Sequence, residues 1–208
     1  MSSPLIRGFV LGFAIAASPG PIFFLCLRRT LVRGRLYGLV SGFGVATADG
    51  FYAALAAFGI AALASAFVGG RRALALLGGV VLVALGAWIL LERRHVLEGE
   101  APPTVRGLAW AYASTLGLTI TNPATIVSFA ALAATLGLGA GGGLARPATL
   151  VAGVLAGSAS WWCMLAFAIS AMRARVTPGL VRGISTASGA VIAALGMLAI
   201  LSAFQLGT

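Results

Sequence analysis

Charged residues are scarce in this 208-residue chain: they make up 9% of it and only four are acidic, against 60% hydrophobic residues. This composition is too apolar for a soluble domain, so it excludes soluble enzymes and soluble binding modules. Lysine is absent, and the fourteen basic residues are all arginines at the ends of apolar runs or in short connections. Because they form no basic face with interleaved aromatic residues, nucleic acid is not an expected partner. The sequence predicts an all-α polytopic membrane protein surrounded by the lipid bilayer.

Cysteine and histidine are also rare, which limits the chemistry open to the chain. The two cysteines, Cys26 and Cys163, lie in apolar sequence without CxxC spacing, and His95 is the one histidine. They predict neither a disulfide framework nor a metal site, and we expect no cofactor. No serine has a histidine partner within an apolar run, so we expect no hydrolase and no other enzyme. One function that would use both cysteines, a membrane thiol–disulfide electron conduit, remains as the alternative to the function considered below.

Apolar runs long enough to cross a bilayer occur six times along the chain. A membrane-spanning helix needs about 20 consecutive apolar residues, and each run reaches roughly that length. We therefore expect six transmembrane helices in a single transmembrane domain, residues 1–208. The runs are Leu5–Leu27, Leu36–Val68, Ala73–Leu91, Leu108–Leu136, Ala148–Met172 and Gly179–Leu206.

The arginines are unevenly divided between the two sides of these runs. The connections after the first, third and fifth runs hold ten of the fourteen, among them Arg28, Arg29 and Arg33. Since arginine-rich connections stay in the cytoplasm, we expect both termini to be extracytoplasmic. The linker 92–107 separates two halves, 1–91 and 108–208, of three runs each. An odd number of spans per half means that two similar halves must be inserted in opposite orientations, as a 3+3 inverted repeat.

A short sequence match supports this repeat. The stretch Gly44–Tyr52 in the second run can be laid on Gly153–Trp161 in the fifth, so that glycine, valine and an aromatic residue coincide. This register brings the helix-breaking residues of the first and fourth runs to nearly corresponding places.

Proline interrupts the first and fourth runs near their middle. Ser18-Pro19-Gly20-Pro21 lies in the first run, and Asn122-Pro123 in the fourth. Proline removes a backbone donor but suits the first position of a helix, and serine or asparagine suits the preceding cap. We therefore expect two broken helices, with Ser18 and Asn122 capping the second halves. Ordinary proline kinks are the alternative interpretation.

Each break would place a helix N-terminus, with its free N–H groups and partial positive charge, inside the membrane. Such an end attracts an anion, most simply a carboxylate. Threonine and serine hydroxyls, Thr121 among them, surround the second break. The residues predicted to bind substrate here are Ser18, Pro19, Gly20, Pro21, Thr121, Asn122 and Pro123.

Asp49 is the one acidic residue within a predicted span. At 1.5 Å per residue it lies roughly 20 Å from the start of its run, near the middle of the membrane. Placing an aspartate there costs about 2.5 to 3.5 kcal/mol, so it should face a cavity or a partner. No arginine lies in a predicted span core, so we expect Asp49 to bind a substrate ammonium or a proton from solution. A structural polar contact with a neighbouring helix is the alternative.

At these residues the chain resembles the lysine exporter family (LysE type, with its homoserine/threonine exporter branch). The resemblance rests on Ser18–Pro21, on the glycines from Gly34 through Gly44 that lead to Asp49, and on Asn122-Pro123. It implies a six-span exporter in the bacterial plasma membrane that moves amino acids or related small cationic solutes and is powered by proton influx. Ala48 and Ala124 depart from the glycine and the lysine common at these positions. Two GxxxG spacings, at Gly8 and Gly153, would permit close helix contacts within the chain or in a homodimer.

Overall fold

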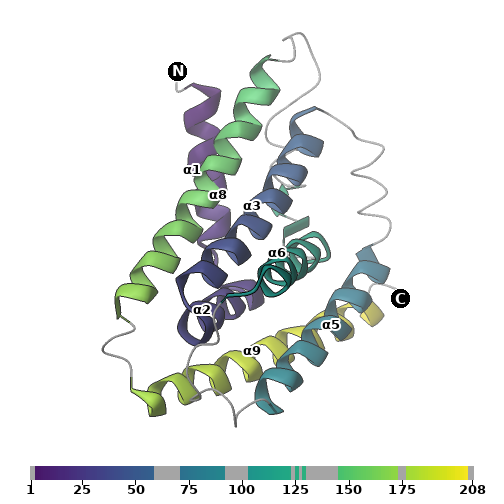
Figure 1. The fold of residues 1–208 in the computed structure, drawn as a ribbon. Helices are drawn as coiled ribbons and strands as arrows, with labels where there is room; N and C mark the ends of the chain where they lie inside the picture. Colours follow the sequence, from purple (N-terminus) through teal and green to yellow (C-terminus); the bar gives the residue numbers. More distant parts are fainter. Residues whose placement is uncertain are drawn as a thin grey trace.

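The computed structural model describes residues 3–58, 71–91, 103–122, 125–126, 128–129, 145–172 and 177–205. Within these ranges the regular structure is entirely helical, as predicted (Figure 1). The helices are α1 (Pro4–Ala16), α2 (Pro21–Arg33), α3 (Arg35–Ala57), α5 (Arg71–Leu91), α6 (Val105–Ile120), α8 (Ala145–Met172) and α9 (Pro178–Gln205).

Three of these helices are long and apolar enough to cross a membrane: α3, α8 and the Arg182–Phe204 part of α9. α1 and α2 together satisfy the same criterion, but as a pair bent by 79° at the break between them. The predicted interruption of the first run is therefore confirmed. The ends of the last two runs are confirmed as well, because α8 ends at Met172 and α9 begins at Pro178, one residue before the expected start. The chain is a multi-pass membrane protein.

The helices form two groups that meet at α2. α1 runs beside α8, and α3 lies between α8 and α6 (Figure 1). α5 and α9 pack on each other as a separate pair, and α2 contacts both α3 and α9. Gly34 links α2 directly to α3 with a φ of 87°, a left-handed conformation that glycine adopts at little cost.

Glycines allow the closest helix contacts. A side chain on Gly8 or Gly12 of α1 would collide with the backbone of α8, and one on Gly153 would collide with α1. Gly79 and Gly86 of α5 approach the α9 backbone in the same way. Small residues at membrane helix contacts permit such close approach. The GxxxG spacings therefore serve contacts within the chain, and the homodimer stays a prediction.

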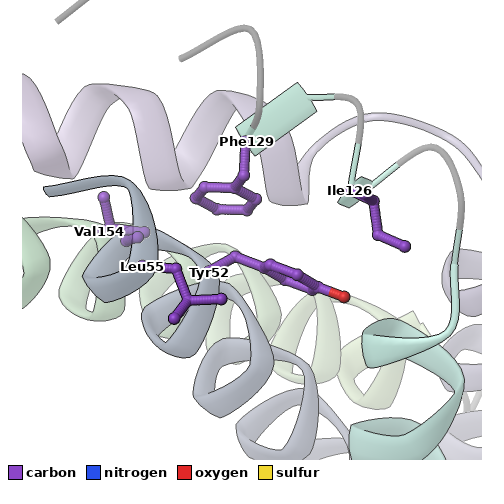
Figure 2. Close-up of a cluster of buried hydrophobic side chains, with 6 residues drawn as sticks. Tyr52, Leu55, Ile126, Phe129 and Val154 are labelled. Atoms are coloured by element: carbon purple, nitrogen blue, oxygen red, sulfur yellow. The ribbon is translucent and has the colours of Figure 1, made fainter. Parts of the chain in front are cut away.

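A cluster of apolar side chains lies beside the second break. Tyr52 and Leu55 of α3 meet Val154 of α8 and Phe129, with Ile126 close by (Figure 2). The rings of Tyr52 and Phe129 stack with centroids 5.8 Å apart. The Tyr52 hydroxyl also donates a hydrogen bond to the carbonyl of Ile120, the last residue of α6. The cluster thus fixes α3 against the chain on both sides of Asn122.

Three arginines lie elsewhere than predicted. Arg28, Arg29 and Arg33 were expected in a connection, but α2 continues through them. Arg28 and Arg29 are buried, at 3% and 8% exposure. The expectation that these arginines lie in a connection between spans is therefore wrong. It failed because the polar groups that solvate a buried guanidinium come from helices distant in sequence, as for Arg29 below.

Candidate functional site

The first break separates two helices that end and begin cleanly. α1 ends at Ala16, where the Ala17 N–H donates to the Phe13 carbonyl and the Ser18 N–H donates to the Ile15 carbonyl. α2 begins at Pro21 and has Gly20 as its N-cap, in an extended conformation, with no side chain capping it. The prediction that Ser18 caps α2 is therefore wrong. Pro21 rather than Pro19 takes the first helical position, so the cap falls two residues after the serine.

The second break has a similar arrangement, with one helix ending and another beginning. α6 ends at Ile120, and the Asn122 N–H donates to the carbonyl of Thr119. The Asn122 carbonyl then accepts a hydrogen bond of 3.1 Å from the N–H of Ile126, and residues 125–126 are helical. A new helical turn thus starts after Asn122, where the sequence predicted it. Pro123 lies outside the described residues.

Both breaks line one cavity. Its volume is about 560 Å³ when the open solvent at its mouth is counted. Six of the predicted binding residues line it together: Ser18, Pro19, Gly20 and Pro21 from the first break, Asp49 from α3, and Asn122 from the second break. Residues more than 100 positions apart in sequence therefore face the same space. The remaining lining residues are Ile15, Ala16, Ile22, Phe23, Val45, Thr119, Thr125, Ser128 and Trp162.

Thr121 is the predicted residue that stays apart from this lining. Its hydroxyl donates to the Gly117 carbonyl 2.9 Å away, and it lies against Gly78 of α5. Thr119, two residues earlier, lines the cavity instead. Because successive residues of a helix point about 100° apart, proximity to a break in sequence does not determine which hydroxyl faces it.

Asp49 is buried, with 2% of its surface exposed. Ser158 of α8 donates a hydrogen bond of 2.7 Å to its carboxylate oxygen Oδ2. Ser158 was not among the predicted site residues, although the match of Gly44–Tyr52 with Gly153–Trp161 aligns Ser158 with Asp49 in sequence. The polar contact considered as an alternative is thus present, and Asp49 faces the cavity as well.

The carboxylate has further capacity to accept hydrogen bonds. An ionised carboxylate offers about four lone-pair directions, and Ser158 is the hydrogen-bond partner that the described residues provide. Among them, no arginine forms an ion pair with Asp49. A cation that enters the cavity would therefore meet a negative group without a competing counter-ion.

The N-terminus of α2 supplies the opposite polarity. Pro21 has no N–H, so the first N–H groups of this helix belong to Ile22 and Phe23, and no side chain caps them. Both residues line the cavity. Free N–H groups at the positive end of a helix form an anion site. The cavity therefore has one pole suited to a carboxylate and one suited to an ammonium group.

Comparison with known sequences identifies the family of this chain. The sequence pattern of LysE type translocators matches residues 13–203. The chain is also similar to "Uncharacterized membrane protein YahN" of Escherichia coli (strain K12), with 28% identity over 114 residues, 54% of this chain. The matched region covers 51% of that protein, so the chain spans about half the length of this relative. No solved structure matches the chain. Because the family pattern covers nearly the whole sequence, the chain belongs to the LysE type translocator family.

Proposed function

We propose that the chain is a secondary active exporter of amino acids or related small amino solutes, coupled to proton influx. The observation that carries the proposal is the meeting of an uncapped helix end and a lone buried carboxylate in one cavity. Membership of a translocator family supports the coarser part, transport of a small solute. An electron conduit is disfavoured because neither cysteine lines the cavity, and both are free thiols.

The carboxylate of the substrate binds at the N-terminus of α2. Its oxygens accept hydrogen bonds from the N–H groups of Ile22 and Phe23, which lack a capping side chain. The apolar walls strengthen this interaction, because they exclude water that would screen it. Ser18 and Asn122 contribute polar atoms on either side of the cavity.

The ammonium group of the substrate binds Asp49, which also exchanges it for a proton. Substrate and proton compete for one carboxylate, so release of one favours binding of the other. This competition couples export of the substrate to entry of a proton without a second ionisable site. The three other acidic residues of the chain all lie within 92–100, which leaves Asp49 as the acidic group for this role.

A 3+3 inverted repeat would provide the alternating access that such a carrier needs. Gly153 packs closely against α1, the helix before the first break. Gly44, its equivalent in the sequence match, packs against Tyr112 and Thr115 of α6, the helix before the second break. In the pair α5–α9, the third and sixth helices expected from the sequence, Gly79 packs on Gly196 and Gly86 on Gly189. These paired glycine contacts support the proposed repeat.

The arginine distribution supports an orientation in the bacterial plasma membrane with both termini extracytoplasmic. A cysteine introduced by Ser2→Cys, in a chain carrying Cys26→Ser and Cys163→Ser, should react with an impermeant thiol reagent on intact cells. A cysteine introduced by Gly99→Cys should be protected in the same cells. The reverse labelling pattern would contradict this orientation.

The test of the proposed function is Asp49→Asn. Asparagine keeps the volume and accepts the Ser158 hydrogen bond, but it cannot change charge. We expect the variant to lose pH-gradient-driven accumulation of radiolabelled amino acids in inside-out vesicles, against full activity of the parent. Transport at the parental rate by Asp49→Asn would disprove the coupling role.

Two controls define what a loss means. The double variant Cys26→Ser, Cys163→Ser should transport like the parent, which would remove the electron conduit as an explanation. Exchange of labelled for unlabelled amino acid without a gradient separates the two roles of Asp49: residual exchange indicates a pure coupling role, and its loss indicates that the ammonium group also binds there.

A further inference from the structure

A buried polar atom in the cavity wall is left without a partner by the fold. Trp162 of α8 is 4% exposed, and its indole Nε1 is buried with no hydrogen-bond partner among the described residues. The indole N–H is a donor only, so an acceptor is required to satisfy it. Leaving a buried N–H unsatisfied is costly, and such groups in native structures call for an explanation. Trp162 lines the cavity, so a bound molecule can supply the acceptor.

Trp162 lies at the end of the cavity where α2 begins. Its side chain packs with Ala16, Ile22, Cys26 and Val45, and Ala16 and Ile22 are on either side of the first break. Ser158 lies four residues earlier on α8 and therefore on the same face of this helix. α8 thus places Ser158 at Asp49 and Trp162 near the N-terminus of α2, one at each pole of the site.

The ring of Trp162 is held in place by close packing. A side chain at Gly42 of α3 would collide with the Cβ and ring of Trp162, so α3 presses directly on the base of the indole. A donor fixed in this way loses little freedom when a ligand binds, which favours affinity.

We propose that the indole N–H of Trp162 donates a hydrogen bond to the substrate carboxylate, together with the N–H groups of Ile22 and Phe23. This inference rests on the proposed function and adds a residue that discriminates free amino acids from their esters and amines. The acceptor is the carboxylate rather than the ammonium group, because an ammonium group carries donors only. Asp49 does not fill this role in the described structure, since it forms no hydrogen bond with the Trp162 Nε1.

Trp161 provides a matched control. Its Nε1 is also buried and has no partner in the described ranges, but its ring packs edge-on against Phe13, with centroids 5.3 Å apart. It is not part of the cavity lining. Trp161→Phe therefore removes the same kind of indole N–H at the neighbouring position, without altering the cavity lining.

The experiment measures the affinity of the purified full-length protein for leucine, threonine and lysine, and for their methyl esters, by thermal shift titration. Trp162→Phe should weaken binding of the free amino acids about tenfold, the order expected for a hydrogen bond to a charged group. It should change the weaker binding of the esters by less than about twofold, and Trp161→Phe should leave both ligand classes unaffected.

Each other outcome overturns the proposal in a recognisable way. Parental affinity of Trp162→Phe for the free amino acids would show that the N–H faces only water. An equal loss for acids and esters would show that Trp162 acts by packing alone. No binding to the parent would overturn both this proposal and the proposed function. If Trp162→Phe fails to fold, benzothienylalanine at position 162 keeps the ring shape, removes the N–H and gives the same readout.

Discussion

Arg29 and Asp49 are both buried charges, but the protein surrounds them differently. The Arg29 guanidinium donates hydrogen bonds to the Ser41 Oγ at 3.0 Å, the Ala111 carbonyl at 2.9 Å and the Ser114 Oγ at 2.8 Å. Within the part of the chain that the structure describes, Asp49 receives one hydrogen bond, from Ser158. The Arg29 donors bond to other groups of the protein. The Asp49 carboxylate instead faces the cavity and can accept further hydrogen bonds there. The first arrangement is structural, and the second is suited to binding.

Position along the helices supports this distinction. Ser41, the partner of Arg29, lies eight residues before Asp49, or about 12 Å along α3. Arg29 does not line the cavity, and its three partners come from α3 and α6. The guanidinium therefore joins α2 to two other helices and is not the counter-ion of Asp49.

The largest expected difference between the two charges is in stability. Arg29→Gln removes three hydrogen bonds that join helices, so we expect a loss of about 1–3 kcal/mol and a fall of several degrees in melting temperature. Asp49→Asn removes a charge whose burial is costly, so its melting temperature should stay the same or rise. Thermal unfolding of both purified variants in the same detergent provides the measurement.

Arg33→Gln is the matched control, because Arg33 is in the last turn of α2 and exposed, with its guanidinium over the Tyr37 ring. We expect it to melt with the parent. A fall for Asp49→Asn as large as that for Arg29→Gln would mean that Asp49 is also a structural group, and the comparison would fail.

The sequence predicted the helices and the breaks more accurately than the contacts between them. α8 and α9 follow their apolar runs closely, since hydrophobic length alone determines where a chain can cross a bilayer. The breaks follow from proline, whose effect on the backbone is local. The position of Arg29 was predicted wrongly because its partner Ser114 lies 85 residues away in sequence. The burial of Arg29 depends on how α2 packs against α3 and α6, which no local sequence pattern indicates.

The candidate site shows the same limit. Asp49 could be chosen from the sequence because an acid in an apolar run is rare and costly. Ser158 could not, because serine is ordinary in membrane helices and only the packing of α8 on α3 gives it a role. The prolines located the first break, but which of them starts α2 was decided by the extended backbone of Gly20.

The smallest expected effect concerns this glycine and tests the anion-binding pole directly. Gly20 has φ −156° and ψ −177°, which any residue adopts, and a Cβ there would meet no atom within 4 Å. Gly20→Ser should therefore fold normally and cap α2, because a serine at this position accepts a hydrogen bond from the N–H of the second or third residue of the helix. Those groups belong to Ile22 and Phe23, the proposed donors to the substrate carboxylate.

Because the serine hydroxyl competes with the substrate, Gly20→Ser should bind amino acids less tightly than Gly20→Ala, which adds the Cβ without the hydroxyl. A cap is worth about 1 kcal/mol, so we expect roughly a fivefold difference in affinity between the two variants. Methyl esters, which lack the charged carboxylate, should show a smaller difference. Equal affinities of Gly20→Ser and Gly20→Ala for free amino acids would mean that the carboxylate binds elsewhere in the cavity, and Asp49 would then be the remaining charged pole of the site.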